Sequence, residues 1–265
     1  MLRVWSISGQ ELVSAPADDF FDVVDIKRFL RTRHGHPVCL QRLMVLDDFA
    51  EPMPGLPLIG PLDFQLVVSP TLMPHRPEQK TQAAYELVGY AVKGGHVDVA
   101  RALLNAGADK EWQDAMDDKT PLAQASYKGH TTLARLLLEA RANIGSVDQG
   151  GRTALMHAAG RGHVELVKLL LEAGAETDAQ DRHGRTALMF ASSRLHHEAA
   201  HALLDGEAGT VTNSEAEPTS PQGAGAPHLE IVRLLLQAKA DVTLRDGEGR
   251  TALMQSSSRA CKAIP

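Results

Sequence analysis

Residues 153–163 read TALMHAAGRGH, and this stretch decides the fold because its pattern recurs through the middle of the chain. The same Thr-[Pro/Ala]-Leu opening stands at Thr120 and at Thr186, so consecutive openings are 33 residues apart. Three histidines keep the same interval of 33: His130, His163 and His196. A fixed interval of this length is typical of stacked repeats, in which each unit buries its apolar face on its neighbours.

Each unit predicts two short helices joined by a turn. The hydroxyl of Thr153 can cap the first helix, and the small apolar residues after it let a neighbouring helix approach closely. Gly162-His163 turns the chain, and residues 164–172 carry the apolar face of a second helix. Gly174 suits the left-handed conformation that ends this helix. The turn at residues 181–184 then leads to the next Thr.

The period, the T-[PA]-L-x-x-A opening, the G-H turn and the L-L-L-x-A-G-A ending together resemble the ankyrin repeat. The resemblance covers residues 83–265 and implies an α-helical ankyrin-repeat solenoid. Such a fold has paired antiparallel helices, projecting β-turn fingers and a concave binding surface. A degenerate first unit is expected near residues 83–117. The later units are expected near 118–150, 151–183, 184–216 and 228–248, with a partial unit over 249–265.

The pattern is interrupted within the repeat that opens at Thr186. Residues 206–227 contain three prolines and several glycines, so we expect a mobile loop there rather than a helix. Helix-like sequence returns at residues 228–236. This helix can dock on the repeat that opens at Thr186 or on the half-unit that opens at Thr251. The helix-ending glycine, present as Gly107 and Gly174, is replaced in three places: Arg141, Glu207 and Lys239. A left-handed residue other than Gly costs roughly 1 kcal/mol.

The first 70 residues have a different pattern. Alternation in residues 2–7 and 11–15 predicts a β-hairpin. Helical spacing over residues 22–33 predicts a helix. Two further strands are predicted at residues 41–46 and 63–68.

This order of two strands, a helix and two strands resembles the ubiquitin-like β-grasp fold. Four segments carry the resemblance: Val24-Asp25-Ile26-Lys27, Gly35-His36-Pro37, Gln41-Arg42-Leu43-Met44 and Phe64-Gln65-Leu66-Val67-Val68. It implies a small α+β domain over residues 1–70, then a linker over 71–82, and an apolar recognition patch at Ile7, Met44 and Val67. Conjugated members of that family end in Gly-Gly, whereas Ser69-Pro70 follows the last strand here. The domain is therefore expected to act as a docking surface.

Composition excludes several classes of function. The net charge of −6 is not the basic footprint that phosphate binding needs, so nucleic acid is not an expected partner. Cys39 and Cys261 lie far apart, so neither a disulfide framework nor a metal-binding pair can be read from them. Residues 1–12 lack the apolar run of a signal peptide, and no stretch is long enough to span a membrane. We therefore expect an intracellular protein, cytoplasmic or nuclear, with no cofactor and no metal ion.

Residues 197–201 spell HEAAH, an H-E-x-x-H pattern whose two histidines can share a zinc ion on one face of a helix. The repeat register offers another interpretation. Glu198 falls where Glu165 stands one unit earlier, and His201 falls where Lys168 stands. No third ligand follows in a recognisable motif. A zinc peptidase is thus the alternative of another class, while the register favours the exposed face of a repeat helix. The histidine that recurs once per unit is likewise interpreted as structural.

Variable side chains on the repeated frame are the candidate contacts with partners. Trp112 lies in the finger before the unit of residues 118–150. An aromatic residue there can act as a binding hot spot, or it can equally fold back on the neighbouring finger. The ankyrin resemblance places four variable inner-helix residues toward the concave face: Tyr127, His157, Phe190 and Gln255. A basic column is expected beside them: Lys128, Arg161 and Arg194. For any single residue, a solvated face without a partner is the simpler interpretation.

The sequence therefore favours a non-enzymatic adaptor or scaffold that binds other proteins through its fingers and its concave face. A ubiquitin-pathway adaptor that docks through the N-terminal domain is the alternative within the same class. The identity of the partner and the oligomeric state stay open.

Overall fold

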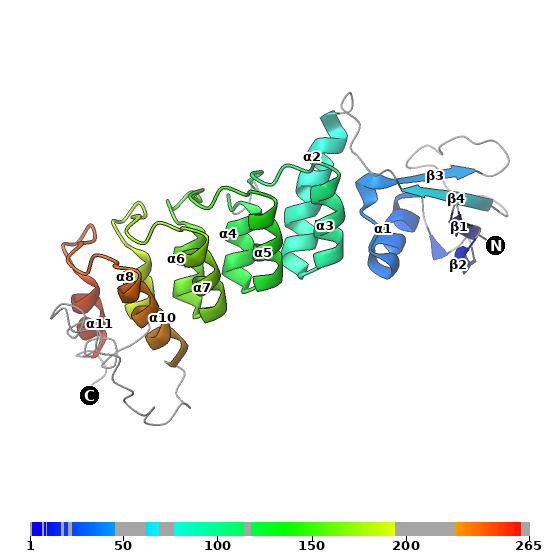
Figure 1. The fold of residues 1–265 in the computed structure, drawn as a ribbon. Helices are drawn as coiled ribbons and strands as arrows, with labels where there is room; N and C mark the ends of the chain where they lie inside the picture. The colour runs from blue at the N-terminus through cyan, green and yellow to red at the C-terminus, as the bar shows by residue number, and fades with distance from the viewer. Residues whose placement is uncertain are drawn as a thin grey trace. The chain divides into compact units, whose positions relative to one another are not determined.

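The computed structural model describes residues 2–6, 8, 10–16, 19–20, 23–45, 62–68, 77–113, 118–193 and 226–260 (Figure 1). The chain divides into two compact units, Met1–Asp109 and Lys110–Pro265. The first unit contains a sheet and several helices, and the second is built from helices and the fingers between them.

The first unit contains a four-stranded sheet in the order β2-β1-β4-β3. Its strands are β1 (Leu2–Ser6), β2 (Glu11–Ala15), β3 (Gln41–Val45) and β4 (Leu62–Val68). β1 pairs antiparallel with β2 and parallel with β4, and β3 pairs antiparallel with β4. The predicted order of two strands, a helix and two strands is confirmed, with α1 (Val23–His34) as the helix.

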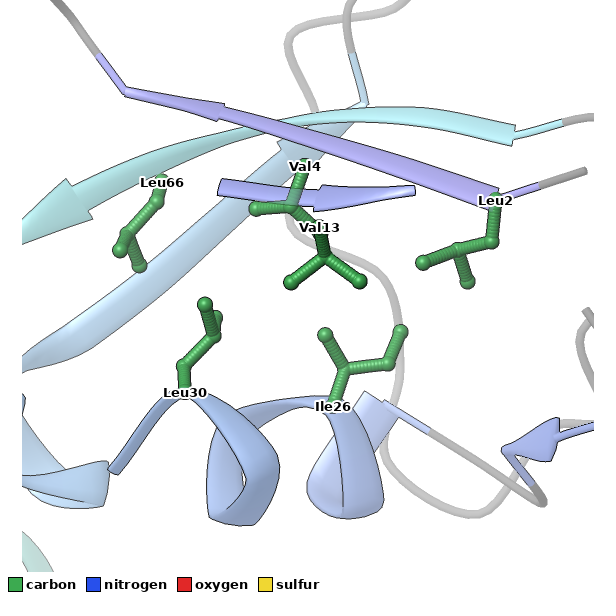
Figure 2. Close-up of a cluster of buried hydrophobic side chains, with 6 residues drawn as sticks. All are labelled: Leu2, Val4, Val13, Ile26, Leu30 and Leu66. Carbon is green, nitrogen blue, oxygen red and sulfur yellow. The ribbon is translucent and has the colours of Figure 1, made fainter. Parts of the chain in front are cut away.

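A small apolar core lies between this sheet and α1 (Figure 2). Ile26 and Leu30 stand four residues apart, so they share the face of α1 that is turned to the strands. Four residues meet them from the sheet: Leu2 and Val4 of β1, Val13 of β2 and Leu66 of β4. The alternation of Leu2 and Val4 with the exposed Arg3 is what gives β1 one buried face.

A buried carboxylate joins the helices after the sheet to α1. They are α2 (Pro77–Glu86), the π-helical segment η3 (Leu87–Val92) and α3 (Val97–Asn105). The side chain of Glu86 is 1% exposed, and its Oε1 accepts hydrogen bonds from Arg31 Nη1 at 3.2 Å and Val38 N at 2.7 Å. The Arg31 guanidinium also lies 3.8 Å from the centre of the Tyr90 ring. The expected linker over residues 71–82 is shorter than predicted, since residues 77–82 belong to α2. Pro77 begins this helix, and Pro is favoured in a first helical turn.

The second unit repeats one helix pair. The pairs are α4 (Pro121–Lys128) with α5 (Thr131–Glu139), and α6 (Ala154–Arg161) with α7 (Val164–Glu172). α8 (Ala187–Ser192) opens the next pair. The predicted caps are confirmed, because the hydroxyls of Thr120, Thr153 and Thr186 accept hydrogen bonds at 3.3, 3.3 and 3.4 Å from the backbone N–H groups of Ala123, Met156 and Met189.

The helix that returns after the interruption, α10 (Ala226–Gln237), packs on α8 and α7. α11 (Ala252–Ala260) also packs on α8. A Cβ added to Gly162 would lie 2.9 Å from the His228 ring, and a Cβ added to Gly129 would lie 2.6 Å from the His163 ring. His228 thus stands over the preceding unit as His163 does. The sequence leaves two docking sites open for this helix. The structure shows the one on the repeat that opens at Thr186, which contains α8.

We therefore interpret α8 and α10 as the two helices of one unit. Thr251 lies 65 residues after Thr186, which is 32 more than the regular interval of 33. The difference is accounted for by 32 extra residues in the connection between α8 and α10. The expected loop over residues 206–227 lies outside the described residues, except for Ala226 and Pro227, which begin α10.

In two repeats, the second helix is followed by a left-handed residue other than Gly. These helices are α5 and α10. The backbone angle φ is +61° at Arg141 and +64° at Lys239, in the place where Gly107 and Gly174 have +91° and +84°. The predicted strain is confirmed at these two positions, and Glu207 lies outside the described residues.

We expect Arg141→Gly and Lys239→Gly each to raise the free energy of unfolding by about 1 kcal/mol, because Gly adopts a positive φ without steric cost. Urea denaturation followed by circular dichroism measures the change. The matched control is Gly174→Arg, since a Cβ at Gly174 meets no atom within 4 Å and only backbone strain would be added. Equal stability of all three variants and the wild type would contradict the assignment of strain.

Deleting residues 196–227 should leave a folded protein, because the deletion joins residue 195 to His228 and restores the interval of 33 from Thr186 to the next capping Thr. We expect the free energy of unfolding to be unchanged or higher, since a shorter connection costs less closure entropy. Thermal denaturation checks this. As a comparison, Ile231→Ala in the full chain should lower stability by about 2–5 kcal/mol, because the Ile231 side chain of α10 is fully buried. A deletion variant that does not fold would exclude the pairing of α8 with α10.

Candidate functional site

A buried aspartate organises each of three fingers between helix pairs: Asp148, Asp181 and Asp246. In each finger, Oδ1 accepts hydrogen bonds from the backbone N–H groups two and four residues farther along the chain. The N–O distances are 2.8 and 2.9 Å for Asp148, 2.9 and 2.9 Å for Asp181, and 3.0 and 2.8 Å for Asp246. One carboxylate oxygen thus closes each turn directly before the next capping Thr.

The other oxygen of each aspartate binds a side chain of the same unit. Asp148 Oδ2 lies 2.9 Å from His157 Nε2, and Asp246 Oδ2 accepts a hydrogen bond from Gln255 Nε2 at 2.7 Å. Both partners stand nine residues after their aspartate, on the inner helix. Phe190 has the same place after Asp181 but no polar atom, and Asp181 Oδ2 accepts two hydrogen bonds from Arg185, at 3.0 and 2.7 Å. Arg250 makes the same two bonds to Asp246 Oδ2 beside Gln255.

These aspartates are absent from the expected contact residues, although Asp181 belongs to the turn that the sequence predicts at residues 181–184. The interval of 33 between Asp148 and Asp181 was the available signal, since it matches the interval between the capping threonines. What the sequence does not reveal is that each finger folds back onto the inner helix.

The environment of the fingers alters three pKa values. Burial lowers the pKa of His157, although Asp148 acts in the opposite direction. Burial alone would raise the pKa of Asp181 and Asp246, but hydrogen bonds from Arg185 and Arg250 outweigh it, so both carboxyl pKa values lie below the ordinary one. Asp181 and Asp246 are therefore charged near pH 7, and the His157 imidazole is neutral.

An aromatic and cationic cluster forms around Tyr127 at the end of α4. The Arg161 guanidinium lies 3.9 Å from the centre of the Tyr127 ring and donates a hydrogen bond to Tyr127 Oη. Lys119 Nζ lies 5.3 Å from the same ring centre, and the His157 ring meets it edge-on with centres 5.8 Å apart. The structure thus brings together three of the residues expected to contact a partner, although His157 is only 6% exposed.

Phe190 of α8 forms a second cluster of the same kind. The guanidinium carbons of Arg185 and Arg152 lie 4.6 and 5.7 Å from the centre of its half-buried ring. Arg152 and Arg185 each precede a capping Thr, as Lys119 does in the unit before. A cation directly before the cap therefore faces an inner-helix ring in both clusters.

The remaining expected contact residues are more scattered. Lys128 is exposed at the end of α4, and Trp112 is half-buried in the finger segment before it. Arg194 lies outside the described residues, as does Ile7 of the ubiquitin-like patch. Met44 lies on β3 and Val67 on the neighbouring β4, so two members of that patch are on adjacent strands.

Within the described part of the chain, no group of three or more His, Cys, Asp or Glu residues is placed to hold a metal ion. The HEAAH motif at residues 197–201 lies outside that part. The helices that the structure describes include none that is both long and apolar enough to cross a bilayer.

Stacked helix pairs with hydrogen-bonded fingers define a helical-repeat protein. The family model described as "Ankyrin repeats (3 copies)" matches residues 70–148 and 124–215, which together are more than half of the chain. The chain therefore belongs to the ankyrin-repeat family. A stretch of 61 residues is 41% identical to the "Ankyrin repeat and KH domain-containing protein mask" of Drosophila melanogaster. That stretch is 23% of this chain but only 1% of the relative's length.

We expect the stability of the wild type to depend on pH through His157. Its folded pKa lies below the ordinary value of 6.5, so the stability supported by the neutral ring is present above that value and is lost as the pH falls toward the folded pKa. His157→Gln keeps a hydrogen-bond donor for Asp148, as Gln255 does for Asp246, but cannot be protonated. Thermal melting between pH 7.5 and 5.5 should therefore show a smaller loss for the variant (~2 pH units suffice to span the titration).

The control for this experiment is His157→Leu, which has no donor for the buried Asp148 and should be destabilised at both ends of the pH range. His163, whose pKa burial also lowers, titrates in every variant and cancels in the comparison. Parallel pH dependence of the wild type and His157→Gln would exclude His157 as the titrating group.

Proposed function

We propose that this protein is a non-enzymatic adaptor or scaffold that binds partner proteins across its fingers and inner helices. Its membership in the ankyrin-repeat family supports a role in protein–protein interaction. One observation carries the finer proposal: Tyr127 and Phe190, at variable places of a repeated frame, each lie against arginine side chains and remain partly exposed.

Such pairs suit a binding surface for physical reasons. Aromatic side chains bury much area with few rotatable bonds lost. Aromatic and arginine side chains together dominate the energetics of many interfaces. Stacking of Arg161 on Tyr127 and of Arg185 on Phe190 orders these side chains before a partner arrives. Ordering in advance lowers the entropic cost of association. The buried His157 ring packs edge-on against Tyr127 and is held in place by its hydrogen bond with Asp148.

The proposal is tested by affinity capture from cell extract with three baits. They are the full chain, a Tyr127→Ala/Phe190→Ala variant, and a control with exposed outer-helix changes, Arg135→Ala/Glu172→Ala. We expect the control to retain the proteins that the wild type captures and the aromatic variant to lose them. For an identified partner, at least one of the two aromatic changes should cost more than about 1 kcal/mol. Identical captures by all three baits would exclude this surface.

We also propose that the sheet and α1 form a ubiquitin-like docking domain with Ile7, Met44 and Val67 as its patch. The strand order, the parallel pairing of β1 with β4 and the α1 core support this proposal. A Met44→Ala/Val67→Ala bait separates the two surfaces, since the proteins it loses should differ from those lost by the Tyr127→Ala/Phe190→Ala bait.

A zinc peptidase remains the candidate of another class because of residues 197–201. Metal analysis of the purified protein distinguishes it: one zinc ion per chain that disappears in His201→Ala would favour the peptidase. The proposed location is intracellular, cytoplasmic or nuclear, and the separation of Cys39 from Cys261 in the sequence supports it.

A further inference from the structure

A pocket of about 590 Å³ opens among three consecutive fingers of the second unit. Backbone hydrogen bonds fix the spacing of its walls: Arg182 N donates to Gly150 O at 2.9 Å, and Gly247 N donates to His183 O at 2.7 Å. Its volume is in the range of pockets that enclose several side-chain-sized groups. We call it the finger pocket. Its charged or titratable lining residues are Arg152, Arg182, His183, Arg185, Asp246, Glu248 and Arg250.

Two of the four arginines are oriented by buried carboxylates. Arg185 binds Asp181 through Nε and Nη2 at 3.0 and 2.7 Å, and Arg250 binds Asp246 in the same way at 3.1 and 2.9 Å. The side chains of Asp181 and Asp246 are 0% and 2% exposed, so neither acid is presented to a ligand. These aspartates hold the guanidinium groups in place, while the outer edges of the groups remain at the pocket.

The other two arginines have no carboxylate of their own within the described part of the chain. Arg152 Nε lies 3.9 Å from the carboxylate of Asp181, which Arg185 already occupies. Arg182 is exposed and makes no ion pair with any described residue. The remaining acid, Glu248, is 72% exposed where it pairs with Arg250, so a ligand carboxylate can displace it.

We propose that the finger pocket binds the carboxylate side chains of an acidic segment in a partner protein, an inference that rests on the proposed role in protein binding. Guanidinium groups bind carboxylates through two charge-assisted hydrogen bonds. Arg185 and Arg250 each donate two such bonds to one oxygen, Oδ2, of the chain's own aspartate. The chain as a whole has a net charge of −6. The overall charge therefore gives an acidic segment no general attraction to the chain, whereas the four arginines of the finger pocket attract it locally.

The ring of Phe190 extends the recognition. Arg152 and Arg185 both line the finger pocket and both lie over Phe190. A segment that places its acids among the arginines therefore brings its neighbouring side chains toward an aromatic surface. The expected ligand alternates acidic and apolar residues.

Fluorescence anisotropy with the full chain tests the proposal. The probe is a short labelled peptide that alternates Glu and Leu, compared with one that carries Gln for Glu and one that carries phosphoserine for Glu. We expect the Glu peptide to bind and the Gln peptide to bind at least about tenfold more weakly. Equal binding of the Glu and Gln peptides, no binding of the Glu peptide, or tighter binding of the phosphoserine peptide overturns the assignment to carboxylates.

A matched pair of variants locates the site. Arg152→Gln/Arg182→Gln removes the two arginines that lack a carboxylate of their own, and Arg135→Gln/Arg233→Gln removes the same charge from exposed faces of α5 and α10. We expect the first variant to weaken binding of the Glu peptide about tenfold and the second to leave it nearly unchanged. Equal weakening by both would show only non-specific charge attraction and would overturn the proposal. If the Tyr127→Ala/Phe190→Ala bait loses partners while the finger variant binds like the wild type, the proposed function stands and this inference fails.

Discussion

The hydrogen bonds around one buried carboxylate per finger are the interaction on which the second unit depends. Asp148, Asp181 and Asp246 each close a turn with one oxygen and anchor a side chain with the other. The closed turn delivers the next Thr to the position where its hydroxyl caps a helix, and that helix then meets its neighbour. Because a buried charge without partners is costly, the finger has few alternative conformations.

This arrangement separates positions that must be kept from positions that can vary. The residue nine places after each aspartate is His157, Phe190 or Gln255, and only the polar two bind the carboxylate. Arg185 binds Asp181 where Phe190 stands, and Arg250 binds Asp246 although Gln255 also does. In these two fingers an arginine therefore satisfies the carboxylate whichever side chain the inner helix carries, so the surface can change its chemistry while the backbone keeps its shape.

Much of the helical part could be predicted because its signals are local. The capping threonines, the left-handed glycines and the apolar faces each act within a few residues, so the interval of 33 was enough to place them. The signal that determines the position of α10 is not local. By residue count alone, the second helix of the repeat that opens at Thr186 would follow His196. In that segment, alanines occupy the two register positions that Ile231 and Val232 occupy in α10. The larger buried side chains favour α10, which only the packing on α8 reveals. For the candidate site, Tyr127 and Phe190 followed from the register, but the finger aspartates and the pocket needed the tertiary structure.

The separation of α8 from α10 along the chain also has a consequence for how the second unit folds. Helix pairs such as α6 and α7 meet across a turn of two residues, Gly162-His163, and can form at once. Pairing of α8 with α10 must first close the 32 intervening residues beyond the usual turn, which slows the search for contact. In a stack whose units stabilise their neighbours, structure then spreads from residues 120–172 toward the C-terminal side. A nascent chain therefore exposes the apolar face of α8 for longer than those of α4 and α6, and a chaperone has most reason to bind α8 during that interval.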